Sequence, residues 1–170
     1  MKRRTFADSC CPIARSLDVV GEWWTLLILR DAILYGPSRF DSLQRHLGIS
    51  PNMLSARLGH LLEEDLLVRR PYSQRPPRDE YIATDKAREL LPVLVALAAW
   101  GRRWVEGEPE MSVLLHGERF DHPVAAVMTC ARCDAPVDSA HLRQDGSSTW
   151  PRALTDGVSG TGTEGNQGIA

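Results

Sequence analysis

Two separate pairs of cysteines are the residues whose type and spacing most directly suggest chemistry. Cys130 and Cys133 are separated by two residues, so both thiolates can hold one tetrahedral metal ion across a tight turn. His116 and His122 precede this pair and are the candidates for the other two zinc ligands, with His141 as a less favoured substitute. The alternatives are a vestigial ribbon without metal and a redox dithiol. The sequence therefore indicates no obligatory cofactor and zinc as an optional one.

The other two cysteines, Cys10 and Cys11, are adjacent near the start of the chain. Adjacent cysteines rarely pair with each other, and free thiols are typical of a reducing compartment. A thiol that precedes a helix is biased toward the thiolate, because the helix dipole favours negative charge there. Cys11 is therefore a candidate redox sensor. The competing interpretation is a small, buried packing residue.

Four arginines and no acidic residue occur between positions 69 and 78, namely Arg69, Arg70, Arg75 and Arg78. On a hairpin, such side chains can contact the phosphates of DNA or enter its minor groove. A solvated surface turn would have a similar composition. Composition alone therefore does not distinguish a DNA-binding hairpin from a solvated turn, and the pattern of the preceding helix is needed as well.

A leucine stripe marks the helix expected beside this loop. Four leucines between Leu54 and Leu62 repeat at helical spacing after Pro51, with Ser50 as a good N-cap. The opposite face carries small or uncharged polar residues, which permit close approach to a groove floor and can read base edges. Arg57, on the flank, is suited to a phosphate. The predicted DNA contacts are Ser50, Asn52, Ser55, Ala56, Arg57, His60, Arg70, Arg75 and Arg78, and Gly59 lies on the same face.

Three further helices are predicted before this one. Apolar spacing indicates helices over about 12–20 and 22–34, divided at Gly21. A third helix is expected to start at Ser38, whose hydroxyl would cap it with Asp41 in a weak capping box. It should end at Gly48, and the short junction Gly48-Ile49-Ser50 would then force two helices to cross with Ile49 in the angle. This arrangement is a helix-turn-helix.

Two short strands are predicted after the helix pair, at 67–72 and 80–83, with a proline-rich loop at 73–78. Thr84 and Asp85 are expected to cap one long helix over 85–105, kinked at Pro92. Its circumference is almost entirely apolar, which indicates burial on several sides. A second copy of the chain most simply supplies that cover, with help from residues 13–20. The alternative is that segment 111–142 covers the helix in cis.

The net charge of −2 hides an asymmetry along the chain. Residues 1–104 contain 16 Lys or Arg and 12 Asp or Glu, whereas residues 105–170 contain 4 and 10. The basic part coincides with the predicted DNA surface. No run of about eighteen apolar residues occurs, and no apolar core follows the basic start. A cytoplasmic protein that neither spans a membrane nor is secreted is therefore expected.

Three units are expected along the 170 residues. Residues 1–106 would form a winged helix-turn-helix with a dimerisation helix, residues 111–142 a small β-rich unit containing the Cys-x-x-Cys pair, and residues 145–170 a disordered tail. The fold class is mainly α with a small β component (α+β), and the C-terminal appendage is zinc-ribbon-like.

Many short stretches between Cys11 and Trp104, more than half of the chain, also follow one family pattern. They are Cys11-Pro12-Ile13, Leu17, Val20-Gly21-Glu22-Trp23-Trp24, Ile28-Leu29-Arg30, Phe40-Asp41-Ser42-Leu43, Ile49-Ser50-Pro51-Asn52-Met53-Leu54-Ser55, Arg57-Leu58, Leu61, Leu66-Leu67 and the stretch from Tyr81 to Leu94. Together they resemble the HxlR-type winged helix-turn-helix regulators, relatives of the MarR-type group. The resemblance implies a bacterial homodimer on promoter DNA, usually a repressor and sometimes an activator.

The resemblance also implies that Cys11 occupies a position where some members sense oxidants or electrophiles. One departure is Glu22, near which the family commonly has Lys or Arg, and this puts a phosphate contact or the local packing in doubt. The expected function is sequence-specific transcriptional regulation, repressing from a near-palindromic site and responding to redox state or a small ligand. An effector pocket could lie between the long helix and the DNA-binding core.

Two other classes of function compete with this one. A winged helix used only for protein–protein contact is the alternative, and the arginine-rich loop argues against it. An enzyme is not expected, because His46, His60 and the scattered carboxylates show no nucleophile–base spacing and no glycine-rich phosphate loop occurs.

Overall fold

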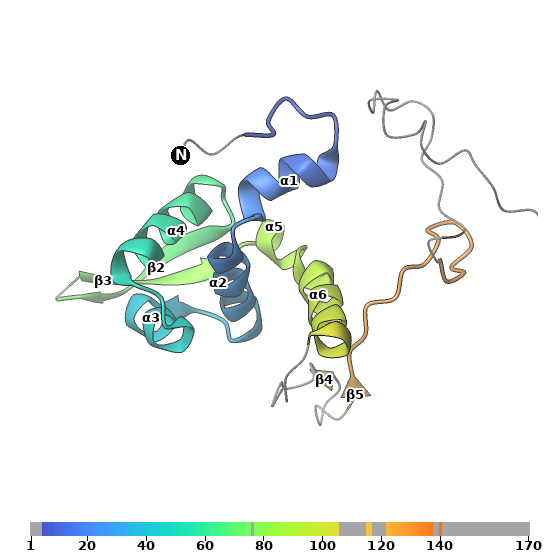
Figure 1. The fold of residues 1–170 in the computed structure, drawn as a ribbon. Coiled ribbons are helices and arrows are strands. Elements are labelled where there is room, and N and C mark those ends of the chain that lie inside the picture. Colours follow the sequence, from blue (N-terminus) through green and yellow to red (C-terminus); the bar gives the residue numbers. More distant parts are fainter. Residues whose placement is uncertain (1–4, 76, 106–114, 117–121, 138–139, 141–170) are drawn as a thin grey trace, which may run out of the picture.

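The computed structural model describes residues 5–75, 77–105, 115–116, 122–137 and 140, with only the backbone described for 115–116 and 122–123 (Figure 1). Within these residues the helices are α1 (Pro12–Val20), α2 (Trp23–Leu34), α3 (Phe40–Leu47), α4 (Pro51–Glu63), α5 (Asp85–Arg88) and α6 (Leu91–Trp104). The strands are β1 (Ser38–Arg39), β2 (Leu67–Gln74), β3 (Pro77–Ala83), β4 (Leu115–His116) and β5 (His122–Pro123).

Helix α2 is the centre around which the winged domain packs. It contacts α1, α3, α4, α5, α6 and the strand β3. Most of its residues are apolar, and Ile28 and Leu29 are completely buried. The three leucines Leu54, Leu58 and Leu61 of α4 meet this core, as the leucine stripe predicted. The whole fold is therefore α+β, with helices on a small sheet, as expected for a winged helix.

The turn between α3 and α4 has the predicted helix-turn-helix geometry. Gly48 ends α3 with a φ of 65°, a left-handed conformation that glycine adopts without strain. Ile49 is only 3% exposed and fills the angle between the helices. Ser50 caps α4, because its hydroxyl accepts a hydrogen bond of 3.4 Å from the Met53 amide, and Pro51 occupies the first turn. This local arrangement orients the whole of α4.

The start of α3 differs from the prediction. Ser38 is not an N-cap but part of β1, where it pairs with Tyr81 of β3. Its hydroxyl donates to the Gly36 carbonyl at 3.0 Å instead of accepting from the helix. Arg39 takes the N-cap position, and no side chain caps the helix there. The partner strand lies far along the sequence, so a local capping pattern could not show this.

The wing is a three-stranded antiparallel sheet in the order β1-β3-β2. Its hairpin is longer than predicted, since most of the expected loop 73–78 belongs to β2 and β3. The prolines do not prevent this. Pro71 lies on the edge strand β2, next to an irregularity in the pairing, and Pro77 is the first residue of β3. Arg75 lies in the turn between β2 and β3, and Arg78 pairs with Ser73 next to that turn, so both lie at the far end of the hairpin. Figure 1 shows the β2–β3 hairpin projecting from the helices.

The predicted single helix over 85–105 is in fact two helices, α5 and α6. Thr84 caps α5, with its hydroxyl accepting from the Ala87 amide at 3.2 Å, as expected. Pro92 does not kink a continuous helix, because it lies in the first turn of α6, where its missing amide costs nothing. Figure 1 shows α6 extending away from the core formed by α2–α5.

Beyond residue 105 the structure describes a small part of the chain. Strands β4 and β5 pair antiparallel, with His116 opposite His122. Residues 145–170, expected to be a tail, and His141 lie outside the described residues, as does much of the predicted unit 111–142. Among the described residues no helix is long and apolar enough to cross a membrane.

Candidate nucleic-acid interface

Helix α4 presents one face to the core and the opposite face to solvent. Leu54, Leu58 and Leu61 are at most 1% exposed, whereas Asn52, Ser55 and Ala56 are exposed. This is the predicted division of the helix into a packing face and a free face. A rigid helix with a free polar face has the dimensions that the DNA major groove accepts.

Gly59 adds open space to the middle of that face. A Cβ atom built at this position would meet no atom of the chain within 4 Å. The backbone there does not need a positive φ, so neither packing nor conformation demands a glycine. The outer face of α4 therefore has no side chain at this position and free space beside the backbone.

Arg57 does not extend freely from the flank of α4. Its Nε lies 3.2 Å from Glu22 Oε2, an ion pair without hydrogen-bond geometry, and both side chains are mostly buried. The same carboxylate accepts a hydrogen bond of 3.0 Å from the Trp24 amide and caps α2. Arg57 thus ties α4 to the start of α2, a partner that its predicted role as a phosphate contact did not include. Glu22, the departure from the family pattern, has this capping and pairing role.

His60 is also held inside the chain. Its Nε2 lies 2.9 Å from the carbonyl oxygen of Val19, which as a pure acceptor requires the ring nitrogen to donate. The His60 side chain is half-buried against the C-terminal end of α1. The prediction that His60 belongs to the free outer face is therefore wrong about its placement. Its partner lies far from it in sequence, and helical spacing alone carries no sign of it.

The arginines of the wing fall into two groups. Arg70 lies opposite Glu80 across the hairpin, and its Nε and Nη2 are both 2.6 Å from Glu80 Oε1. Arg75 and Arg78 are exposed near the hairpin end, and within the described residues neither has an ion-pair partner. Arg69 is exposed too and has no ion-pair partner in the described part of the chain, so of the wing arginines only the charge of Arg70 is already paired.

A further arginine, Arg39, lies at the base of the wing and was not among the predicted contacts. Its guanidinium is 4.2 Å from the centroid of the Tyr72 ring, a cation–π distance. Arg69 and Arg78 line the same shallow hollow of about 320 Å³, together with Asp41 and Asp79. The stacking fixes an exposed cation beside the first turn of α3. In the sequence Arg39 is recognisable only as a basic residue just before a predicted helix. Such residues are too common to identify Arg39 as a DNA contact.

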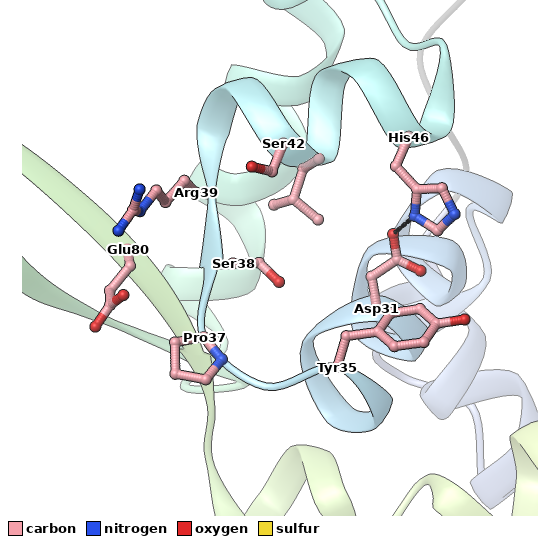
Figure 2. A pocket seen from close by; sticks show the side chains of 9 residues that line it. Asp31, Tyr35, Pro37, Ser38, Arg39, Ser42, His46 and Glu80 are labelled. Carbon is pink, nitrogen blue, oxygen red and sulfur yellow. Dashed lines mark hydrogen bonds and ion pairs between the residues drawn. The ribbon is translucent and has the colours of Figure 1, made fainter.

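A buried carboxylate joins the two helices that precede α4. Asp31 of α2 is 2% exposed and accepts from Arg30 at 2.9 Å. It also accepts from His46 of α3, whose Nδ1 is 2.6 Å away (Figure 2). The pair lies in a hollow of about 370 Å³ that Tyr35 and Glu80 also line. This hollow is bounded by α2, α3 and the sheet, not by the long helix where an effector pocket was expected. Its carboxylates are already paired, so the arrangement ties helices together.

The cysteines are free thiols in the structure. Cys11 is the N-cap residue of α1 and is half-buried, but its side chain makes no capping hydrogen bond. Hydrogen bonds from the Arg132 amide, then the Cys133 amide and the Cys133 thiol, lower the pKa of Cys130 from its ordinary value. The side chains of His116 and His122 lie outside the described part of the chain. Among the residues that are described, no three potential metal ligands cluster.

The crossed helices, the free face of α4 and the β2–β3 hairpin together define a winged helix-turn-helix protein. A family model described as HxlR-like helix-turn-helix matches residues 19–109. The chain belongs to the HxlR-like helix-turn-helix family, as its sequence pattern suggested.

Relatives and solved structures agree with this assignment. The HTH-type transcriptional regulator Rv3095 of Mycobacterium tuberculosis is 46% identical over 130 residues, covering 76% of this chain and 82% of the relative. The crystal structure of PA1607, described as a candidate transcription factor, matches with a TM-score of 0.73 and 35% identity over 84% of this chain and 99% of that one. The oxidised form of the redox regulator HypR matches with a TM-score of 0.50 and 30% identity over 57% of this chain and 100% of that one. The chain is therefore a transcription regulator with a DNA-binding helix-turn-helix, and not an enzyme.

Proposed function

We propose that the protein binds duplex promoter DNA sequence-specifically, with α4 in the major groove and the wing on the flanking backbone. One observation supports this most: α4 is anchored by fully buried leucines while Asn52, Ser55 and Ala56 remain exposed. Asn52 and Ser55 can hydrogen-bond base edges, and Gly59 leaves room for the groove wall. Ser50, at the helix start, can donate its hydroxyl hydrogen to a phosphate while its oxygen accepts the capping bond.

The wing would supply the contacts that do not depend on sequence. Arg75 and Arg78 are exposed at its tip, and Arg39 adds a cation at its base. Arg57, Arg70 and His60 have partners within the chain, so in this proposal they position α4 and the hairpin. Phosphate contacts of this kind orient a protein on the duplex without reading its sequence.

We further propose that the protein acts as a homodimer. The face of α6 formed by Val93, Leu97, Trp100 and Trp104 is 51–64% exposed in the single chain. Ile13 of α1 is 72% exposed as well. Exposed apolar side chains along one helix are characteristic of an interface, and a two-fold pair would place two α4 helices on a near-palindromic site. A dimer that covers a promoter would block transcription, so we propose that the protein represses. Binding to chromosomal DNA would also require a cytoplasmic location.

The dimer proposal is tested by sedimentation of the full chain at several concentrations. Leu97→Glu should convert the dimer to monomer, because it buries a charge in the interface. Tyr35→Glu is the control, since Tyr35 is also exposed (67%, against 51% for Leu97) but lies at the C-terminal end of α2, against His46 of α3. A wild-type chain that sediments as a monomer would refute the homodimer.

A response to redox state through Cys11 is supported by its place at the start of α1 and by the similarity to the redox regulator HypR. A small ligand remains the alternative effector. Zinc held by Cys130, Cys133, His116 and His122 is proposed as an optional structural ion. Metal analysis of the purified protein tests it, and a metal-free protein with unchanged folding would exclude it.

The experiment for DNA binding is a fluorescence titration of the full protein against a duplex selected from random sequences. Affinity should fall steeply with salt, because phosphate neutralisation releases counterions. It should also be stronger, by about a thousandfold or more, than affinity for an unrelated duplex. No duplex binding at any salt concentration would instead favour the alternative, a winged helix that contacts other proteins.

A further inference from the structure

A hollow between the wing and the start of α3 collects three arginine side chains. Arg39 of β1, Arg69 of β2 and Arg78 of β3 all line this hollow of about 320 Å³. All three are exposed, and among the described residues none of them has an ion-pair partner. They come from three different strands, so the pairing of the sheet brings together charges that are distant in sequence.

An irregularity in the pairing of β2 with β3 directs an aromatic ring into the same hollow. In a regular strand Tyr72 would point to the opposite face from Arg69, because neighbouring side chains alternate. The register instead shifts between Pro71 and Ser73, and Tyr72 and Arg69 line the hollow together. Such irregularities re-aim a side chain. The Tyr72 ring then stacks on the guanidinium of Arg39, 4.2 Å from the ring centroid, and holds that charge in the hollow.

The acidic residues nearby do not neutralise the three arginines. Asp41 and Asp79 also line the hollow, but in the described part of the chain neither forms an ion pair with an arginine there. Glu80 lies opposite Arg39 in the sheet, and its carboxylate is already paired with Arg70. Three guanidinium groups against two carboxylates leave an excess of positive charge. A phosphate group, with several oxygen acceptors, is the kind of ligand that clustered guanidinium groups bind.

Helix α3 begins at the edge of this hollow. Its first two residues, Phe40 and Asp41, line the hollow, and no side chain caps the helix. In helix-turn-helix proteins the helix before the recognition helix crosses the DNA backbone. We propose that the hollow binds one phosphodiester of the bound duplex, with Arg39, Arg69 and Arg78 donating to its non-bridging oxygens. This inference rests on the proposed function and adds to it one phosphate held at a fixed place between α3 and the wing.

The test replaces single phosphates of the selected duplex by neutral methylphosphonates, one position at a time. At the phosphate that the hollow holds, the change should weaken binding of the wild-type chain by about tenfold, because charge-assisted hydrogen bonds are lost. Arg39→Gln should weaken binding to the unmodified duplex by a similar factor. The same methylphosphonate should then cost this variant about twofold or less, because the two changes remove one interaction. Arg69→Gln should behave in the same way.

Arg75→Gln is the matched control, because Arg75 is an exposed arginine of the wing that does not line the hollow. It should weaken binding to every duplex, while the methylphosphonate still costs about tenfold, as expected for independent contacts. Circular dichroism checks that all variants keep the fold. Duplex binding without any position coupled to Arg39 and Arg69 would overturn the proposal and leave the proposed function intact. A wild-type chain that binds no duplex would refute the proposed function itself, and this inference with it.

A second measurement separates a DNA phosphate from a small phosphorylated ligand. Inorganic phosphate is titrated into the DNA-free protein, and the backbone amide NMR signals of Phe40 and Asp41 are followed. We expect no saturation at millimolar phosphate, because the proposed ligand is one group of a long polyanion whose other contacts supply most of the affinity. Saturation at these signals, without a coupled methylphosphonate position, would overturn the assignment to DNA and identify a site for a small phosphorylated molecule.

Discussion

Helix α4 and the β2–β3 wing lie side by side in the same domain, but they are held in place in different ways. Three leucines of α4 are at most 1% exposed, so the helix is fixed by the core. Along β2 only Leu67 is buried, and the hairpin is held by its own backbone pairing and by the Arg70–Glu80 ion pair. A side chain on α4 therefore has a defined position, whereas one at the wing tip can adjust.

This difference separates two tasks in DNA recognition. Hydrogen bonds to base edges need donors and acceptors at fixed places, which the outer face of α4 supplies. Contacts to phosphates need charge more than position, which Arg75 and Arg78 supply. The account therefore predicts that α4 determines sequence preference and that the wing determines the general strength of binding.

The largest effect should follow from loosening the anchor of α4. Leu58→Ala removes a side chain that is 1% exposed and should lower the free energy of unfolding by about 2–5 kcal/mol, because it leaves a cavity. Val68→Ala in the wing, 47% exposed, is the control and should cost under about 1 kcal/mol. Urea denaturation of both variants measures the difference. Equal losses would mean that the two regions are anchored alike.

Asn52→Ala tests the reading role of α4. On the selected duplex it should weaken binding by about 1–3 kcal/mol, because a base-edge hydrogen bond is lost. Binding to an unrelated duplex should hardly change, since no phosphate contact is removed. Parallel titrations on the two duplexes measure this. An equal loss of affinity for both duplexes would show that Asn52 does not recognise a base and contacts DNA independently of sequence.

The helix-turn-helix was predictable from the sequence because its determinants are local. Gly48, Ile49 and Ser50 act on their immediate neighbours, and the leucine stripe needs only helical spacing. The misplaced residues all have distant partners: Arg57 pairs with Glu22, and His60 with the carbonyl of Val19. Helical periodicity gives the direction of a side chain but not the group it will meet.

The same reason explains the other corrections. Ser38 belongs to a strand only because β3, far along the chain, lies beside it. The break between α5 and α6 depends on a proline whose position allows either a kink or a helix start, and local sequence does not distinguish the two.

Gly59→Ala should separate folding from binding. In a helix interior with free space around it, alanine should raise the free energy of unfolding by about 0.5–1 kcal/mol. The same methyl group should weaken DNA binding, because it reduces the approach of α4 to the groove. Thermal unfolding and a duplex titration measure the two effects. An alanine variant that is more stable and binds equally well would show that this part of α4 does not approach DNA.

The smallest effects are expected among the wing arginines. Arg75→Ala should weaken binding to every duplex and reduce the slope of log affinity against log salt by about 1, the loss of one phosphate contact. Arg70→Ala should change that slope less, because Glu80 already neutralises it. It should instead lower stability by under about 1 kcal/mol. A larger change of slope for Arg70 than for Arg75 would reverse the assignment.

The most direct test of the central claim, that α4 lies in the major groove, is dimethyl sulfate protection on a selected duplex with guanines in both half-sites. Methylation occurs at guanine N7, which faces the major groove. The account predicts two protected patches about one helical turn apart, on the same face of the duplex, when the protein is bound. If dimethyl sulfate methylates these guanines as fully in the complex as in free DNA, α4 does not lie in the major groove.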